Sequence, residues 1–152
     1  MSSLRTELLF EIRAEISEVQ VVGPTPSGNR RFRPVKGGTV SGPRISGEVL
    51  PGGGDWLLIR SDGVRSLDVR ITFRADDGHL VYASARGLFA ISPEAFERIQ
   101  NGEDVDPAEY YFRTTPMFET SSEKYAWLNR VVAVSVGQFT AAAVLQTVYA
   151  VL

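Results

Sequence analysis

The sequence predicts an all-β protein: a closed antiparallel meander β-barrel with one short helix at about residues 93–101. Three observations favour this fold. Stretches of alternating apolar and polar residues recur along the chain, and short turns such as "SDG" and "ADDG" separate several of them. Glycines also gather at positions 37, 38, 42 and 47, as they do where barrel strands bend. Closure would remove the two exposed edges of an open sheet.

The size and charge of the chain exclude several classes of protein. At 152 residues it is predicted to be one domain, residues 1–152, that buries roughly 70% of its unfolded surface. Lys and Arg number 16 against 18 Asp and Glu, so the net charge is −2, and we expect no nucleic-acid partner. No segment is apolar and long enough to span a membrane, so we expect a cytoplasmic protein with no membrane contact.

The N-terminal third is predicted to contain two extended segments joined by a loop. Residues 4–16 alternate in a way that gives one buried strand face, made of Leu8, Phe10, Ile12, Ala14 and Ile16. The segment "VGPTPSGNRR", residues 22–31, has two prolines and two glycines and is predicted to be a loop outside any ladder. A second extended stretch begins at Phe32.

The rest of the chain reads as a meander interrupted by one helix. Strands are predicted at 55–60, 65–75 and 79–90, and then at about 109–119, 127–137 and 140–151. Ser92 can cap the helix, Pro93 suits its first position, and Gly102 can end it. Phe96 and Ile99 give this helix one narrow apolar stripe, which predicts a lid or plug against the sheet.

Several motifs in a fixed order identify a family resemblance. They are the Gly-Gly-Asp-Trp turn, the Leu-Asp-X-Arg strand, Tyr-Phe-Arg-Thr, Phe-Glu-Thr and Tyr-X-Trp-Leu-Asn. Over nearly its whole length the chain resembles the domain-of-unknown-function family 3237, also called uncharacterised protein family 311. The resemblance implies a compact antiparallel β-barrel. It places the family motif on Asp55, Trp56, Asp68, Arg70, Tyr111, Arg113, Phe118, Glu119, Tyr125, Trp127 and Asn129.

Three positions depart from the family pattern, and each replaces a polar group by an apolar one. Leu57 stands where the resemblance implies Gln, Ala85 where it implies Asn, and Phe89 where it implies Arg. If these positions face the interior, the resemblance implies a drier pocket than that of a typical member.

Asp68 and Arg70 allow two interpretations. They lie two residues apart on a predicted strand and therefore project from one face, opposite Leu67 and Val69. They form either part of an ordinary solvated outer face or an ion pair inside the barrel. Inside, the carboxylate could anchor or deprotonate a ligand, provided that good hydrogen bonds offset its desolvation.

Residues 109–130 hold six aromatic side chains, which favour either a ligand site or a well-packed core. For Phe112 and Phe118 we favour the core. Arg113 and Glu119 are equally compatible with a functional site and with an ordinary ion pair at the surface or rim.

The repertoire of other chemistry is small. His79 is the single histidine and follows a turn, and no Gly-X-Ser-X-Gly elbow accompanies it, which argues against a catalytic triad. Cysteine is absent and no paired histidines exist, so we expect no metal and no cofactor. The glycines of "GGTVSG" lack the lysine and the βαβ context of a phosphate-binding loop.

We therefore expect a barrel that binds a small apolar or aromatic ligand in its lumen and performs cofactor-independent acid/base chemistry of the isomerase, cyclase or lyase type, as in secondary metabolism. Asp68 or Glu119 would transfer the proton, and Arg70 and Arg113 would stabilise negative charge. The expected ligand-binding residues are Asp55, Trp56, Leu57, Tyr111, Tyr125, Trp127 and Asn129. One alternative is a non-catalytic, lipocalin-like carrier, and another is a solid barrel that acts through its surface as a homo-oligomer.

Overall fold

The computed structural model describes residues 2–152 as an 11-stranded antiparallel sheet with one α-helix and two short 3₁₀ helices. The strands are β1 (Thr6–Ile16), β2 (Gln20–Thr25), β3 (Gly28–Ser41), β4 (Ser46–Val49), β5 (Gly54–Asp55), β6 (Leu58–Ile59), β7 (Arg65–Ala75), β8 (Leu80–Ala90), β9 (Tyr111–Thr120), β10 (Ala133–Phe139) and β11 (Ala143–Val151). The helices are α1 (Pro93–Gln100), η1 (Pro107–Glu109) and η2 (Ala126–Arg130).

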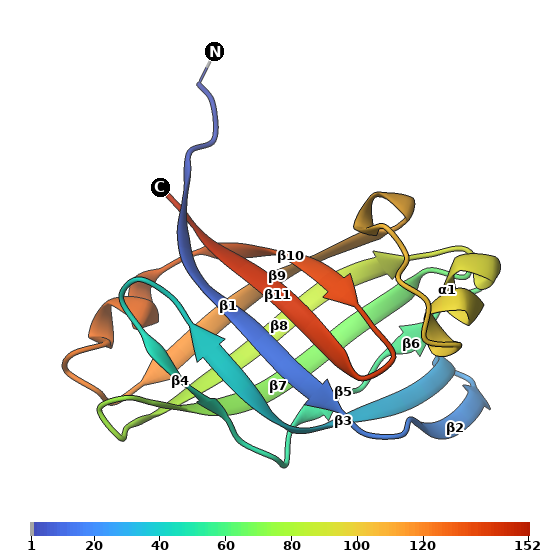
Figure 1. Ribbon diagram of the computed structural model, residues 1–152, viewed down its shortest axis with the longest axis horizontal. Coiled ribbons are helices and arrows are strands. Elements are labelled where there is room, and N and C mark those ends of the chain that lie inside the picture. The colour runs from blue at the N-terminus through green and yellow to red at the C-terminus, as the bar shows by residue number, and fades with distance from the viewer. Residues whose placement is uncertain (1) are drawn as a thin grey trace.

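The sheet closes on itself, as the sequence predicts. Its order is β1-β11-β10-β9-β8-β7-β4-β3-β2, and β1 also pairs with β3, which completes the ring (Figure 1). The short strands β4, β5 and β6 share one position between β3 and β7, so the barrel has eight strand positions. The predicted antiparallel β-barrel with one short helix is confirmed.

The first strand is confirmed, but its predicted face is wrong at one position. The pairing of β1 with β11 shifts register between Leu8 and Phe10. Because of this irregularity Leu9 turns inward and is 2% exposed, whereas Leu8 is 43% exposed. From Phe10 onward the predicted alternation holds, and Ile12, like Phe10, is buried.

The loop predicted at 22–31 is wrong, because this segment forms the β2–β3 hairpin. Val21 pairs with Arg31 and Thr25 with Gly28, and the register shifts between Val21 and Gly23. Since β2 pairs only with β3 and is an edge strand, the N–H that Pro24 lacks is not needed for a second ladder.

A second correction concerns residues 127–137. The segment begins as the 3₁₀ helix η2, in which the Leu128 N–H donates to the Tyr125 carbonyl at 3.0 Å. The ladder starts only at Ala133, where β10 pairs with β11. The predicted strand at 55–60 is likewise assigned as two short pieces, β5 and β6.

The two ends of the barrel differ in their packing. Helix α1 lies across one end, next to β6, as the predicted lid or plug (Figure 1). Ser92 caps this helix by accepting a hydrogen bond from the Ala95 N–H at 3.1 Å. Toward β4, the ring of Phe10 packs edge-on against Phe73 and Phe118, with centroid distances of 5.9 and 5.4 Å. None of the helices described within residues 2–152 has the length and apolar character of a membrane-spanning helix.

Candidate functional site

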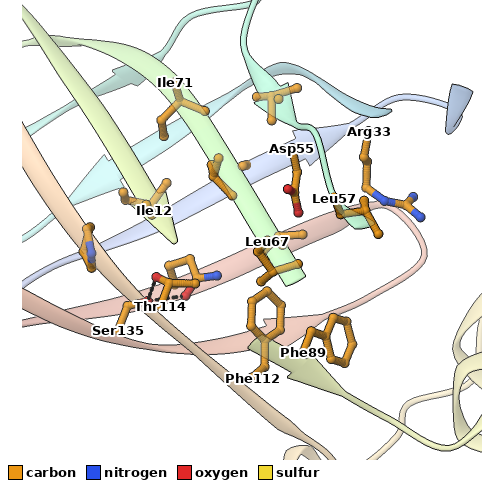
Figure 2. Close-up of a pocket in the computed structure, with 18 of the residues that line it drawn as sticks. Ile12, Arg33, Asp55, Leu57, Leu67, Ile71, Phe89, Phe112, Thr114 and Ser135 are labelled. Carbon is orange, nitrogen blue, oxygen red and sulfur yellow. Dashed lines mark hydrogen bonds between the residues drawn. The ribbon is translucent and has the colours of Figure 1, made fainter. Parts of the chain in front are cut away.

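The barrel encloses a cavity of about 110 Å³ in its lumen, lined mainly by apolar side chains (Figure 2). A cavity of about 150 Å³ is known to hold benzene, so this space suits roughly one small ring. Six polar or charged side chains reach its wall: Arg33, Asp55, Arg65, Thr114, Ser135 and Gln146.

Asp55 reaches this wall from β5, the short strand between β3 and β7. It pairs with Arg33 on one side and Val69 on the other, and both of these residues also line the cavity. Gly54 allows β5 to lie this close to β3, because a Cβ atom there would meet the Arg33 carbonyl oxygen at 2.5 Å. The Gly-Gly-Asp turn in the sequence thus delivers a carboxylate into the lumen (Figure 2).

The environment of Asp55 favours its protonated form. Burial raises the pKa of this carboxyl to about 6, and the Asp68 carboxylate adds to the rise. Two groups lower the pKa of Asp55 and so oppose this rise. They are the Asp68 N–H, which donates to Asp55 Oδ1 at 2.9 Å, and the Arg33 guanidinium. Among residues 2–152 no group donates a hydrogen bond to the second oxygen, Oδ2. One carboxylate oxygen is therefore held and the other is available.

A hydrogen-bonded chain lies on the opposite wall. Ser135 Oγ donates to Gln146 Oε1 at 2.7 Å, so the short contact between Thr114 Oγ1 and Ser135 Oγ has Thr114 as its donor. Ser135 lies on β10, which is four strand positions from β5 in either direction around the ring. The lumen therefore offers polar groups on two facing walls and apolar surface between them.

Aromatic rings and two arginines occupy the α1 end of the cavity. The Arg65 guanidinium carbon lies 4.2 Å from the centre of the Phe96 ring, and that of Arg33 lies 5.2 Å from the Phe139 ring. Phe96 and Phe139 stack with a centroid distance of 5.6 Å. The lid helix thus contributes one ring to a layer of arginine and phenylalanine side chains.

Asp68 and Arg70 do not face the lumen, so the interpretation that places this pair inside the barrel is wrong. The alternation of β7 turns Leu67 and Val69 into the cavity and Asp68 and Arg70 outward, with 23% and 56% of their side chains exposed. The Asp68 carboxylate lies 3.9 Å from Arg70 Nε and 3.6 Å from Arg86 Nε.

Strand β9 separates its predicted residues in the same way. Tyr111, Arg113 and Glu119 lie on the exposed face, where the Arg113 guanidinium sits 5.1 Å from the Tyr111 ring. Phe112 and Phe118 point inward and are buried, which confirms the expectation that they belong to the core. The three outward residues do not reach the cavity.

The remaining predicted residues divide between the lumen and the outer shell. Leu57 lines the cavity with Asp55, whereas Trp56 points outward and stacks on Phe32 at 4.3 Å. Tyr125, Trp127 and Asn129 lie at or near η2 and do not line the cavity. The Tyr125 hydroxyl donates to the Asp76 carboxylate, Arg44 lies 3.8 Å from the Trp127 ring, and the Asn129 amide bonds both backbone groups of Thr120.

The three departures from the family pattern all line the cavity: Leu57, Ala85 and Phe89. The condition for a drier pocket is therefore met. Phe89 stacks on Phe112 with a centroid distance of 4.5 Å. Together these residues give the lumen much of its apolar surface.

Five polar residues of the lumen were missed from the sequence: Arg33, Arg65, Thr114, Ser135 and Gln146. Thr114 could have been found, because it lies two residues from Phe112 and so shares its inward face. Arg33 sits in a stretch without clear alternation, and nothing in the sequence marks its direction. Within residues 2–152, no group of three His, Cys, Asp or Glu side chains gathers where it could hold a metal ion.

Comparisons with known proteins connect the chain to proteins of bacteria. The family model described as Protein of unknown function (DUF3237) matches residues 4–151. A UPF0311 protein of Rhodopseudomonas palustris is 40% identical over 126 residues, which cover 83% of this chain and 82% of the relative. The crystal structure of a conserved protein of unknown function from the same species covers 100% of both chains with a TM-score of 0.94 and 38% identity.

More distant matches lie in fungi. PR-toxin biosynthesis cluster protein 7 of Penicillium roqueforti is 27% identical over 138 residues, which cover 78% of this chain and 74% of that protein. The crystal structure of an enzyme from Penicillium herquei has a TM-score of 0.72 and 19% identity, and covers 100% of this chain and 97% of the other. The likeness to this enzyme concerns the fold.

Proposed function

The chain belongs to the family Protein of unknown function (DUF3237), and we propose that in this member the lumen binds a small, largely apolar molecule and that Asp55 transfers a proton to or from it without a cofactor. The reaction class is isomerisation, cyclisation, elimination or addition of water. The proton-transfer role thereby moves from Asp68 and Glu119, which lie on the outside, to Asp55.

One observation carries the proposal: a partly buried carboxylate with a raised pKa presents a free oxygen to an apolar cavity. A group whose pKa lies near 6 can exist as base and as acid close to neutral pH, as general acid–base catalysis requires. The apolar wall excludes water from the reacting atoms and leaves room for roughly one ring.

Two of the matched proteins support an enzyme over a structural protein. One is described as an enzyme and shares this fold, and the other is named as a member of a biosynthesis cluster. These names say nothing of the substrate here, so the reaction class rests on the cavity and on Asp55.

Isomerisation of 3-cyclohexen-1-one to 2-cyclohexen-1-one is a suitable test, because this single-ring ketone fits the volume and needs only one proton relay. Asp55 would remove a proton from the carbon between the carbonyl and the double bond and return it at the far end of the dienolate, so the double bond moves and no atom is gained or lost. We expect Asp55→Asn to lower kcat/KM about 10²- to 10⁴-fold.

Glu119→Gln is the matched control, since it removes an exposed carboxylate from the outer face of β9. Its rate should equal that of the parent protein. A wild-type rate in Asp55→Asn would contradict the role of Asp55. Binding of the ketone without any turnover would favour the carrier, the alternative function for the same lumen.

A further inference from the structure

Three arginines gather on the inner side of the barrel at its α1 end, and we call Arg31, Arg33 and Arg65 the arginine cluster. Arg33 and Arg65 line the cavity. Arg31 lies two residues from Arg33 on β3 and therefore on the same face, opposite Leu57, whose carbonyl accepts the Arg31 backbone N–H at 3.0 Å. The register of β6 brings Arg65 to the same end, beside Ile59.

The arginine cluster is unpaired. Among residues 2–152, no carboxylate lies within 4.0 Å of a guanidinium nitrogen of these three residues, and none of their side chains donates a hydrogen bond. Some exposed arginines, in contrast, do form ion pairs: Arg74 contacts Glu48 at 2.8 Å, and Arg98 contacts Glu109 at 3.1 Å. Arg33 and Arg65 thus contact the Phe139 and Phe96 rings, and no ion pair with a carboxylate of residues 2–152 offsets the cost of their burial.

The buried polar atoms of the chain point to the same place. Within residues 2–152, the buried side-chain atoms that lack a hydrogen-bond partner are Asn29 Oδ1 and Arg31 Nε. Asn29 lies four residues and Arg31 two residues before Arg33 on β3, so both side chains are on the inward face of this strand. Buried polar groups in folded proteins are normally satisfied, so a buried guanidinium nitrogen without a partner, two residues from the cavity-lining Arg33, points to a ligand at this end of the barrel.

The charges at this end are out of balance. Burial lowers the pKa of Arg33 and of Arg65; the Arg31 guanidinium lowers the pKa of both further, and Arg33 adds to the lowering at Arg65. Among residues 2–152, Asp55 is the carboxylate whose charge raises the pKa of Arg33, and its own pKa of about 6 weakens that compensation below neutral pH. An added negative charge would therefore stabilise this end of the barrel.

We propose that the arginine cluster binds the carboxylate of the lumen ligand, so that the substrate class is a small apolar carboxylic acid in its anionic form. The inference rests on the proposed function and adds the nature of the head group. A planar guanidinium matches a carboxylate with two parallel hydrogen bonds. The apolar part would lie in the cavity, past Leu57 and Phe89, and the carboxylate would lie against the guanidinium groups of Arg33 and Arg65.

Benzoate and benzamide test the head group, because they have the same size and shape and differ in charge. Binding is measured by isothermal titration calorimetry at pH 7 on the full chain. We expect benzoate to bind roughly 10- to 100-fold more tightly than benzamide, as for hydrogen bonds to a charged group. Arg33→Met and Arg65→Met keep the apolar stem of each side chain and should each remove most of this preference.

Arg113→Met is the matched control, since Arg113 is an exposed arginine on the outer face of β9, and it should change neither affinity. Equal binding of benzoate and benzamide by the parent protein, or equal losses for both in the two cluster variants, would overturn the anionic head group and leave the apolar lumen site standing. Failure of both probes to bind would overturn the lumen site and this inference with it.

Discussion

The backbone N–H of Asp68 donates to the Asp55 carboxylate at 2.9 Å, so one aspartate of the family motif fixes the other. The two residues lie on adjacent strands, and their side chains point to opposite sides of the barrel wall. Asp55 presents its free oxygen to the cavity, while the Asp68 carboxylate lies outside near Arg70 and Arg86. The backbone of Asp68, and not its side chain, thus holds the proposed catalytic group in place.

Asp68→Asn should leave the activity nearly intact. The substitution keeps the backbone N–H, so the position of Asp55 is preserved, and it removes a carboxylate that raises the pKa of Asp55 only as a secondary influence. We expect turnover of 3-cyclohexen-1-one close to that of the parent protein, measured with Asp55→Asn alongside. A loss as large as that of Asp55→Asn would return the proton-transfer role to Asp68.

The free energy of unfolding should depend on pH because of Asp55. Its pKa is about 6 in the folded state against 3.8 for the ordinary side chain, so the folded protein holds this proton more tightly than the unfolded chain. The Asp55 contribution is therefore complete below pH 3.8 and is lost as the pH rises through about 6, a change of about 3 kcal/mol. Urea denaturation between pH 4 and pH 7 measures it.

Asp55→Asn provides the comparison for this pH profile. Asparagine has no such proton, so the free energy of unfolding of this variant should rise relative to that of the parent protein across the same range. Asp76 and Asp77, whose pKa values are lowered by hydrogen bonds from Tyr125 and Ser122, act equally in both proteins and cancel. Parallel profiles for the two proteins would show that Asp55 is not desolvated.

The architecture could be read from the sequence because it depends on local patterns. Alternation identifies the strands, turn residues join them, and the Ser-Pro pair starts α1. The segment 22–31 was wrongly predicted as a loop. The free-energy cost of Pro24 in a ladder depends on whether its strand lies at an edge, and that is a property of the whole sheet.

The site was harder to predict because the side of a barrel wall that a residue faces is a tertiary property. Asp68 lies between Leu67 and Val69, so its outward direction was one of the two alternatives left open. Asp55 was named, but its role depends on Gly54, on the Asp68 N–H and on burial, none of which is visible locally. The arginine cluster assembles from β3 and β7, far apart in the chain.

Restoring the polar family residues should change the ligand preference. Leu57 and Ala85 both line the cavity, so Leu57→Gln with Ala85→Asn would add two amide groups to an apolar wall. We expect the affinity for phenol to rise relative to that for toluene, because unpaired buried amides favour a ligand that can bond to them. An unchanged ratio would mean that the new side chains leave the lumen.

Gly137→Ala should destabilise the barrel. A Cβ atom at this position would lie 2.6 Å from the Phe112 ring, which is itself stacked on Phe89 and has little room to move. Overpacking of this kind costs about 1–3 kcal/mol. Denaturant unfolding measures the loss, and adding Phe112→Leu should recover part of it. A midpoint equal to that of the parent protein would show that the ring shifts freely.

Phe96 should control how fast ligands enter the lumen. Its ring lines the cavity and also an outer depression between α1 and the 59–65 segment, so it separates the two spaces, with the Arg65 guanidinium 4.2 Å away.

Ala95 and Ile99 are the buried anchors of α1, so Phe96→Ala should open this end without releasing the helix. We expect benzamide to associate faster in this variant, and to dissociate faster still because the ligand also loses apolar contact with the ring, as NMR line shapes would report. Glu94→Ala, which removes an exposed side chain of the same helix that lines neither space, should leave both rates unchanged. Equal rates in Phe96→Ala and the parent protein would place the ligand entrance elsewhere on the barrel.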